Sequence, residues 1–301
     1  MGERCAVVSG GTGFVGRFVV ERLLEEGYAV TVTGRGSPAA GMFSQPVRFV
    51  ADHLEPDEDH AQTFSGVDYF VHCAFSHVPG KYRGGEGDDP ISFRRRNLEG
   101  TLARFRAAKA AGVKRAVFLS SRAVYGEQPP GAVLDEVTEP RPNSLYGEVK
   151  LACETGLGEL AGDGFFGISL RATGVYGPPP AGQAHKWAGF VADFCAGRPV
   201  ASRQGTEVHG DDLAWAVVTA LTARLEKPHE VFCVSDILID NADIAGICAE
   251  VTGIRHALPG RCDPGSYNAM SSARLKALGW RLGGWPLFEA SVRELAAEVT
   301  A

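Results

Sequence analysis

The stretch that decides the fold is residues 4–16, which read RCAVVSGGTGFVG. Its apolar first half fits a buried parallel strand, and apolar residues then recur at helical spacing as far as Leu24. The glycines therefore fall in the turn between a strand and a helix, where Gly-x-x-Gly-x-x-Gly is typical of dinucleotide binding. We expect Gly10 to permit the tight turn, Gly13 to let the backbone approach a pyrophosphate, and Gly16 to let helix and strand pack closely. The phosphates would then lie at the positive end of the helix.

Strands and helices continue to alternate through the first half of the chain. Repeated strand–helix units imply a parallel sheet with helices on both faces, so the predicted fold class is α/β, a Rossmann-type doubly wound parallel sheet. Ligands in such sheets bind beyond the carboxyl ends of the strands. Further strands are predicted at 28–33, 47–50, 67–73 and 115–119, and helices at 91–111 and 144–161.

After residue 177 the pattern of long parallel units breaks. We expect residues 1–177 to form a dinucleotide-binding domain and residues 178–301 a small C-terminal substrate-binding lobe, interleaved with the last strands of the sheet. His185, Lys186 and Trp187 near its start fit either a grip on an anionic or cyclic substrate or a packed helix start. Short strands are predicted near 199 and 206, and helices at 211–225, 241–251 and 285–299.

Composition and charge narrow the function classes. The 301 residues carry a formal net charge of −6, with 45% apolar and 22% charged residues, which is ordinary for a globular protein with a real core. The acidic balance argues against a nucleic-acid partner, which needs a concentrated basic face. No segment approaches the roughly 18 apolar residues of a membrane span, and no signal peptide is apparent. The seven cysteines are scattered without C-x-x-C spacing, which predicts reduced thiols in a cytoplasmic protein and no metal site.

The tip of the second predicted strand bears on the choice of cofactor. Dinucleotide folds that prefer NAD place an acidic residue there to bind the ribose 2′-hydroxyl. Here the tip reads Thr33-Gly34-Arg35, with one guanidinium and no carboxylate. Because an arginine can neutralise a 2′-phosphate and bind it with two hydrogen bonds, the sequence favours NADP over NAD. NAD stays open if Arg35 is only a solvated loop residue.

A phenol and an ammonium four residues apart, Tyr146 and Lys150, lie on one face of the helix predicted at 144–161. Asn143 or Ser144 can cap that helix. A phenol is a poor acid or base at neutral pH, and an ammonium beside it favours the phenolate. Together with Ser121, which follows the fifth strand, they predict a catalytic set. Tyr146 would exchange the proton of the substrate hydroxyl, Ser121 would hold that oxygen, and Lys150 would bind the ribose and polarise the phenol.

A series of further motifs follows in order along the chain. They are residues 10–16, Asp52, and residues 72–74, 97–101, 120–126, 146–150, 170–178, 208–214 and 278–280. In these motifs the chain resembles the extended short-chain dehydrogenase/reductases, the NAD(P)-dependent nucleotide-sugar epimerase/dehydratase-like family. The likeness runs from residue 4 to the end.

The resemblance implies roles for particular residues, with Ser121, Tyr146 and Lys150 as the catalytic triad. It also implies that the segment after Tyr176 binds the distal half of the substrate, whereas His72 is expected to be structural. Those expected to bind the cofactor are Gly10, Thr12, Gly13, Phe14, Val15, Gly16, Arg35, Asp52, His53, Cys73, Ala74, Tyr146 and Lys150. Those expected to contact the substrate are Phe75, Arg122, Gly174, Val175 and His185.

Three departures from the family pattern limit the substrate assignment. Dehydratases of the family carry an acidic pair directly after the catalytic hydroxyl, whereas Arg122 and Ala123 follow Ser121 here, so elimination of water is not expected. Gly174 stands where the sugar-nucleotide enzymes place an asparagine that touches the substrate. Gly205 stands where an arginine often precedes the 208–209 segment, and Arg203 could replace that arginine only after a local shift.

The sequence leaves three functions open. The leading hypothesis is an NAD(P)-dependent enzyme that transfers hydride at a secondary alcohol, in the form of a nucleotide-sugar 4-epimerase. The alternative is an NADP-dependent dehydrogenase or reductase of a smaller carbonyl or alcohol, which the glycine at 174 favours. A non-catalytic NADP-binding sensor is the third. The helices at 91–111 and 144–161 suggest a homodimer, and the Gly/Asp/Pro-rich stretch at 76–90 is either a functional lid or a disordered tip.

Overall fold

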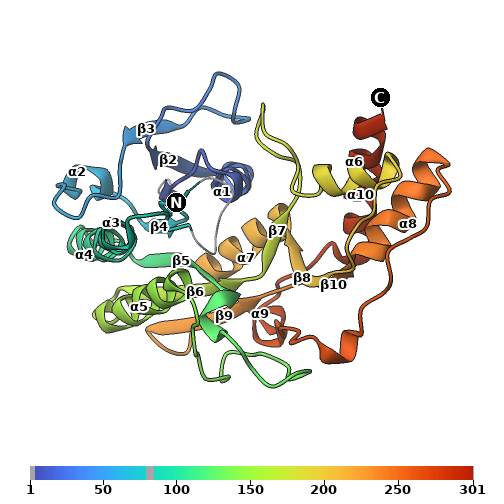
Figure 1. Ribbon diagram of the computed structural model, residues 1–301. Coiled ribbons are helices and arrows are strands. Elements are labelled where there is room, and N and C mark those ends of the chain that lie inside the picture. Colours follow the sequence, from blue (N-terminus) through green and yellow to red (C-terminus); the bar gives the residue numbers. More distant parts are fainter. Residues whose placement is uncertain (1–3, 79–84, 301) are drawn as a thin grey trace.

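A computed structural model describes residues 4–78 and 85–300 of the chain and confirms the Rossmann-type α/β fold (Figure 1). Within that part, the main sheet has seven strands, all parallel, in the order β3-β2-β1-β4-β5-β6-β9. The strands are β1 (Arg4–Ser9), β2 (Tyr28–Gly34), β3 (Arg48–Ala51), β4 (Tyr69–His72), β5 (Arg115–Ser121), β6 (Phe166–Ala172) and β9 (His229–Val234).

Helices cover both faces of this sheet because alternate strand residues point to opposite sides. In β1, Ala6 and Val8 pack into one core with α1 and α7, whereas Val7 packs into another with α4 and α5. The centre of the strand, residues 6–8, must therefore be apolar at every position, as its sequence is. The helices of this part are α1 (Phe14–Glu25), α2 (Ala61–Phe64), α3 (Pro90–Arg94), α4 (Thr101–Ala110), α5 (Leu145–Leu160), α7 (Gly210–Thr222) and the short α9 (Ala273–Ala277).

The long helix predicted at 91–111 is interrupted. Between α3 and α4 runs a π-helical segment, Arg95–Gly100, of a kind that often occurs at functional sites. Its Asn97 side chain accepts a hydrogen bond from the Ser76 amide at 2.6 Å and donates one to the Ser76 carbonyl at 2.7 Å. Gly100 lies so close to the Leu54 carbonyl oxygen that a Cβ there would overlap it. The segment thus anchors the chain where it leaves β4.

The helix predicted at 144–161 is confirmed as α5. Its cap is Ser144, whose hydroxyl accepts a hydrogen bond from the Gly147 amide at 3.2 Å. Two glycines in its last turns allow close packing: a Cβ on Gly156 would overlap the Leu102 side chain, and one on Gly158 would lie 2.8 Å from the His229 ring. Tight packing therefore compensates for the low helix propensity of these glycines.

The last part of the chain builds a lobe around a second, three-stranded sheet, β10-β8-β7. Its elements are β7 (Gly174–Tyr176), α6 (Ala188–Cys195), β8 (Gln204–His209), β10 (Ile237–Asp240), α8 (Asn241–Thr252) and α10 (Gly284–Thr300). The strand predicted near residue 206 is present as β8. The strand predicted near 199 is wrong, because Pro199 has no N–H to donate and Asn241 instead bonds the carbonyls of Ala201 and Arg203.

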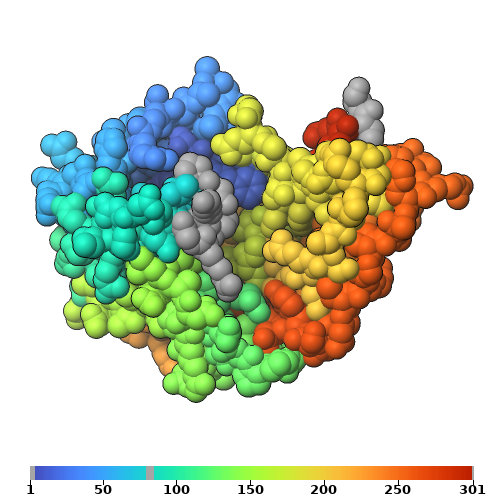
Figure 2. Space-filling view, viewed as in Figure 1, coloured from blue at the N-terminus to red at the C-terminus, as the bar shows by residue number. Residues whose placement is uncertain are grey.

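The two parts of the chain interleave. The strand β9 joins the main sheet beside β6, and α7 packs against α1, although both follow residue 177 in the sequence. We propose residues 1–177 and 178–301 as the functional division. Figure 2 shows the surface hollowed between the blue-to-green half and the yellow-to-orange half of the molecule. No helix among the described residues combines the length and apolar character that a membrane crossing requires.

Candidate functional site

The glycine turn after β1 has the shape that a pyrophosphate requires. Gly10 has a positive φ of 69°, and a Cβ there would lie 2.7 Å from the Ala74 Cα. A Cβ on Gly16 would overlap the Gly10 carbonyl oxygen. The helix α1 begins after Gly13 without a side-chain cap, so its first amides remain to be satisfied by an anion. These residues fit a dinucleotide, as the sequence predicts.

Thr12, Phe14 and Val15 belong to the same turn and to the start of α1. Phe14 packs edge-on against Phe18 with ring centroids 5.7 Å apart, and Val15 is partly buried against the core beneath the turn. A Cβ on Gly34 would lie 3.4 Å from the Thr12 hydroxyl. Thr12 therefore faces the end of β2.

Asp52 forms a buried ion pair that the sequence does not predict. Its carboxylate accepts hydrogen bonds from the Arg104 guanidinium, at 2.9 Å from Nε, and from Thr33 and the Leu54 amide. Burial alone would raise the pKa of Asp52, but the bonds and charge of Arg104 outweigh it and hold the pKa at about 2. Asp52 is thus an ionised group, beside the ends of β2 and β3, that is already bonded by protein donors.

A cavity of about 330 Å³ lies beside the ends of β2 and β3. Arg35 is exposed at its edge, and no ion pair engages its guanidinium within the described part of the chain. Its lining contains two arginines, which are candidates for binding a phosphate, and two glutamates, and Arg96 is already paired with Glu55. Its lining residues are Arg35, His53, Glu55, Glu58, Ser76 and Arg96.

The carboxyl end of β5 carries the predicted hydroxyl. Ser121 pairs with Ala172 in the sheet, and its Oγ accepts a hydrogen bond from the Ala123 amide at 3.1 Å. The start of α5 packs on the same turn, since a Cβ on Gly147 would lie 2.5 Å from the Ala123 carbonyl oxygen. Tyr146, next to that glycine, is thereby brought to the segment that follows Ser121.

Lys150 is the most buried member of the predicted triad, with only 4% of its surface exposed. Its ammonium donates to the Leu119 carbonyl at 2.6 Å and lies 4.4 Å from the Phe75 ring centroid and 5.9 Å from the Tyr146 ring centroid. Burial lowers the pKa of Lys150 to about 8. Phe75 also meets Tyr146 edge-on, with centroids 5.1 Å apart, so these three side chains form one cluster.

The residues at the end of β4 differ in their surroundings. His72 is buried between the Ser9 hydroxyl, at 2.5 Å, and the Thr101 hydroxyl, at 2.8 Å. Burial lowers the pKa of His72 well below its usual range, so it is a neutral structural residue, as expected. Cys73 and Ala74 lie against the backbone of Gly10, where the sequence predicts the cofactor wall.

Next to Gly174, a predicted substrate residue, lies a carboxylate that sequence reasoning missed. In the lobe, Gly174 pairs with Glu207 across β7 and β8. A Cβ on Gly174 would overlap Glu207 Oε2 and lie 2.7 Å from Oε1. Glu207 is 7% exposed and forms an ion pair with Lys186. The glycine at 174 is therefore matched to the acid opposite it, a pairing that only the β7–β8 register reveals.

The other predicted substrate residues have different surroundings. The Arg122 guanidinium lies 5.1 Å from the Tyr267 ring centroid and donates to the Asn268 carbonyl at 2.7 Å. Val175 pairs with Val208 and packs partly against the core. Trp187 is buried and stacks on Tyr176 with centroids 5.1 Å apart, which favours the packed helix start predicted as one alternative.

His185 keeps a polar group inside the lobe. Its Nε2 is buried without a hydrogen-bond partner in the described part of the chain. Burial, together with the charge of Lys186, lowers the pKa of His185 to about 4. The ring is 5.3 Å from that of Trp187. His185 is thus a neutral imidazole that can donate to or accept from a ligand.

A buried ion pair behind the triad also escapes prediction. Glu154 in α5 accepts from Arg171 at 2.7 Å and from the Ser120 hydroxyl, and Arg171 donates to Tyr125 at 3.0 Å. The signal was an arginine inside an apolar strand and a glutamate four residues after Lys150. The pair fixes α5 against β5 and β6, and so fixes the position of Lys150.

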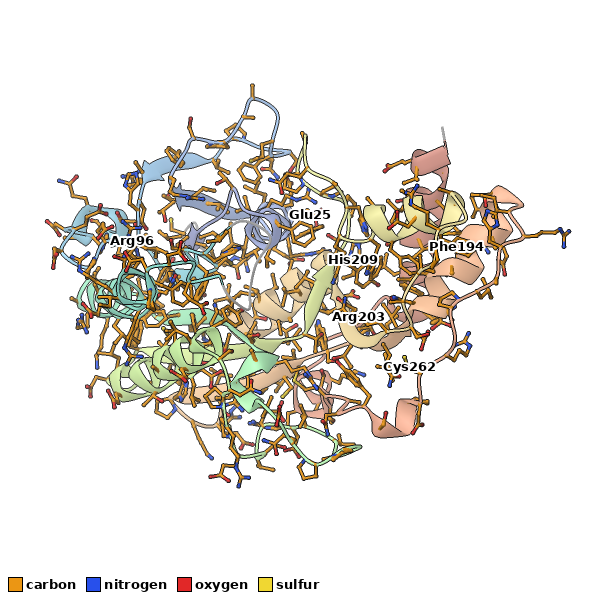
Figure 3. All side chains as sticks on the ribbon, viewed as in Figure 1. Glu25, Arg96, Phe194, Arg203, His209 and Cys262 are labelled. Atoms are coloured by element: carbon orange, nitrogen blue, oxygen red, sulfur yellow. The ribbon has the colours of Figure 1, made fainter. Side chains whose placement is uncertain are left out.

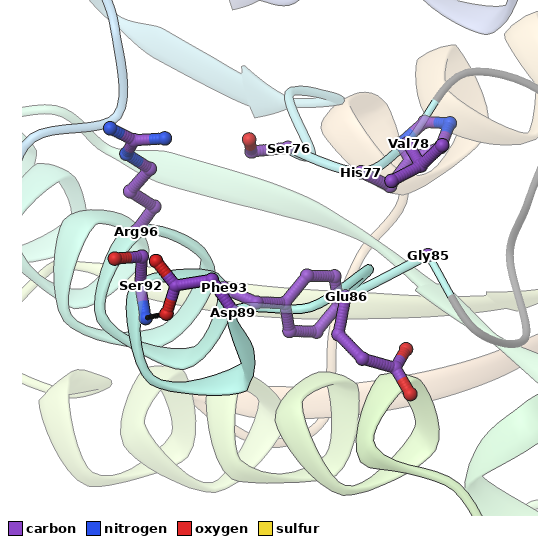
Figure 4. A pocket seen from close by; sticks show the side chains of 9 residues that line it. All are labelled: Ser76, His77, Val78, Gly85, Glu86, Asp89, Ser92, Phe93 and Arg96. Carbon is purple, nitrogen blue, oxygen red and sulfur yellow. Dashed lines mark hydrogen bonds between the residues drawn. The ribbon is translucent and has the colours of Figure 1, made fainter.

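A second cavity, of about 220 Å³, lies over the amino end of α3 (Figure 4). It is lined by Ser76, His77, Val78, Gly85, Glu86, Asp89, Ser92, Phe93 and Arg96. The predicted lid at 76–90 falls only partly within this region, since residues 79–84 lie outside the described residues. The cavity borders the loop after β4 rather than the Ser121 end of β5.

Comparison with known proteins agrees with this geometry. The sequence profile of the NAD dependent epimerase/dehydratase family matches residues 6–234. A UDP-glucose 4-epimerase of Streptomyces lividans is 34% identical over 179 residues, 57% of this chain and 52% of that protein. A human sterol-4-alpha-carboxylate 3-dehydrogenase, decarboxylating, is 32% identical over 183 residues, 58% of this chain and 45% of that protein. The chain thus matches about half the length of these relatives.

Among solved structures, the fold is similar over the whole chain. The UDP-glucose 4-epimerase of Thermus thermophilus, solved in complex with NAD, superposes with a TM-score of 0.77 at 26% identity and covers 99% of both chains.

Proposed function

The chain belongs to the NAD dependent epimerase/dehydratase family, within the extended short-chain dehydrogenase/reductases, and from that premise we propose that it transfers hydride at a secondary alcohol or carbonyl. The observation that carries the proposal is the cluster of Tyr146, Phe75 and buried Lys150 at the carboxyl edge of the sheet, beside the glycine turn. A binding module has no need of a phenol above a buried ammonium, which argues against a non-catalytic sensor.

Each member of the set has a separate task. Tyr146 takes the proton from the substrate hydroxyl, or returns it to the carbonyl. Ser121 holds the same oxygen with its hydroxyl. The Lys150 ammonium, held in place by the Leu119 carbonyl, favours the phenolate form of Tyr146 by its charge. The bound nicotinamide cofactor supplies the hydride chemistry.

We propose NADP as the preferred cofactor, with NAD as the alternative. Support comes from the exposed Arg35 at the edge of the 330 Å³ cavity, and from the residues Thr33-Gly34-Arg35 at the tip of β2, none of which is acidic. Gly10, Gly13 and Gly16 would hold the pyrophosphate, and Lys150 the nicotinamide ribose. A 2′-phosphate would bind Arg35 by two charge-assisted hydrogen bonds.

Two forms of the reaction remain, and different observations favour each. The names of the relatives support a nucleotide-sugar 4-epimerase-like enzyme, which needs the triad and no additional acid. A net dehydrogenase or reductase of a smaller substrate is favoured by Gly174, which offers no side chain to a sugar nucleotide, and by Glu207 in the space beside it. The human relative is named as a dehydrogenase of a sterol rather than of a nucleotide sugar.

Cofactor retention separates the two forms. An epimerase keeps its cofactor through the cycle, whereas a reductase must exchange it. Nicotinamide absorbance that stays with the purified protein would indicate the epimerase form, and its loss would indicate the reductase form. In both forms we expect NADP to raise the melting temperature more than NAD does. If neither cofactor changes the melting temperature, the proposed function is refuted in both forms.

We further propose a homodimer through α4 and α5 and a cytoplasmic location. None of the seven cysteines, all of which lie in the described residues, forms a disulfide, which suits a reducing compartment. A monomer mass by light scattering at micromolar concentration would refute the dimer.

A further inference from the structure

The carboxylate of Glu207 lies between two glycines, which place no side chain over it. Oε1 lies 2.7 Å from the place of a Cβ on Gly174 in β7, and 3.8 Å from that of a Cβ on Gly205. Gly174 itself is exposed. Lys186 bonds to Oε2, and no donor among the described residues is bonded to Oε1. Oε1 is therefore an acceptor that a ligand above Gly174 can reach.

A series of contacts connects this carboxylate to the catalytic edge of the sheet. Ser121 is followed by Arg122, whose guanidinium lies over the Tyr267 ring. The Tyr267 hydroxyl accepts a hydrogen bond from the Thr206 amide at 3.2 Å, and Thr206 precedes Glu207 in β8. In Figure 3 the label of His209, two residues further along β8, marks this strand between the two halves of the molecule. Glu207 is thus linked, through Tyr267 and Arg122, to the segment that follows Ser121.

The charge around Glu207 disfavours a diphosphate. Neither Gly174 nor Gly205 offers a donor side chain, and Lys186, which forms the ion pair with Glu207, is already engaged by it. A phosphate that approached Gly174 would meet a carboxylate that is only 9% exposed at its side chain, where solvent screens charge poorly. A hydroxyl, in contrast, would donate directly to Oε1 at no cost in charge.

We propose that Glu207 determines substrate class: the cleft takes an uncharged, hydroxyl-bearing substrate whose hydroxyl donates to Oε1, and it rejects nucleotide diphosphates. This inference rests on the proposed function and selects the dehydrogenase or reductase form of it. The position of the Glu207 carboxylate requires a glycine at 174, because a side chain there would displace it, and Gly205 adds no side chain beside it.

The test measures the affinity for UDP-glucose by isothermal titration calorimetry, with NADP⁺ at saturation. Glu207→Gln keeps the shape of the side chain and removes its charge. Lys186→Met removes the cation that neutralises Glu207. Glu226→Gln is the matched control, since Glu226 is exposed in the loop before β9, at the opposite edge of the sheet. Coulomb repulsion near a surface predicts binding about tenfold tighter, or more, in Glu207→Gln than in the wild type. Lys186→Met should bind more weakly than the wild type, and Glu226→Gln like it.

Equal affinities for UDP-glucose in wild type and Glu207→Gln, or no detectable binding by either, would overturn the proposal. Such a result would leave the proposed hydride transfer intact, since that depends on the thermal response to NADP and on Tyr146. Circular dichroism and the NADP-induced rise in melting temperature show for each variant that the fold and cofactor site are retained.

Discussion

Lys150 should make the stability of the cofactor-free protein depend on pH in a window set by its own titration. Burial lowers the pKa of its ammonium from 10.5 to about 8. Between these values the unfolded chain binds more protons at this site than the folded chain, so stability rises with pH there. Below about pH 8 both states carry the charge, and the contribution is constant. The shift of about 2.5 pKa units corresponds to about 3 kcal/mol, at about 1.4 kcal/mol per unit.

This magnitude is an upper value. The Leu119 carbonyl, at 2.6 Å, and the faces of the Phe75 and Phe118 rings, at 4.4 and 4.7 Å, all favour the charged form. They therefore offset part of the hydration that the ammonium loses on burial.

The assay is urea unfolding of wild type and Lys150→Met under reducing conditions at pH 7.5, 8.5, 9.5 and 10.5. Subtraction of one protein from the other removes the contributions of groups that titrate in both. We expect the stability of wild type relative to Lys150→Met to rise with pH between 8 and 10.5, by up to about 3 kcal/mol. A difference that stays constant over this range would refute the account of a desolvated ammonium.

Three further predictions concern the cofactor cradle and the ion pair behind the triad. Gly16→Ala should abolish the NADP-induced rise in melting temperature and destabilise the fold by about 2 kcal/mol, because the added Cβ overlaps the Gly10 carbonyl oxygen. Arg35→Ser should weaken NADP binding about tenfold or more and leave NAD binding nearly unchanged in calorimetry, because it removes a charge-assisted contact to the 2′-phosphate. Glu154→Ala should cost about 3–5 kcal/mol in urea unfolding, because it leaves the buried Arg171 without its partner.

Each of these has a control or a contradicting outcome. Gly189→Ala in α6 adds a Cβ that meets nothing within 4 Å, so it should alter neither cofactor response nor stability by much. Equal losses of NADP and NAD affinity in Arg35→Ser would show that the arginine is not a 2′-phosphate ligand. A Glu154→Ala protein as stable as wild type would show that water replaces the carboxylate.

Most of the fold could be predicted from the sequence because its signals are local. The apolar strand, the glycine turn and the helix after it occupy consecutive residues, and β1 and α1 lie where those residues predict them. The interruption at Arg95–Gly100 could not be predicted, because it follows from the contact of Gly100 with the Leu54 carbonyl, a residue distant in sequence. The absence of a strand near 199 likewise follows from bonds made by Asn241.

The candidate site shows the same division. Tyr146 and Lys150 were visible through their spacing on a helix. Glu207 was not, because nothing near it in the sequence indicates that Gly174 lies opposite. Likewise, the bond from Lys150 to the Leu119 carbonyl depends on how α5 packs on β5. Local motifs thus identify the chemistry of the site, whereas pairing between distant strands sets the shape and charge that a substrate meets.

The central claim is that Tyr146 transfers the substrate proton, and Tyr146→Phe tests it most directly. A substrate is first found by screening nucleotide sugars and uncharged secondary alcohols with stoichiometric cofactor. We predict that the variant loses at least about 100-fold in turnover and keeps its NADP affinity within twofold. Tyr69→Phe, at the start of β4 and thus at the opposite edge of the sheet, should turn over like wild type. Wild-type turnover in Tyr146→Phe would contradict the claim.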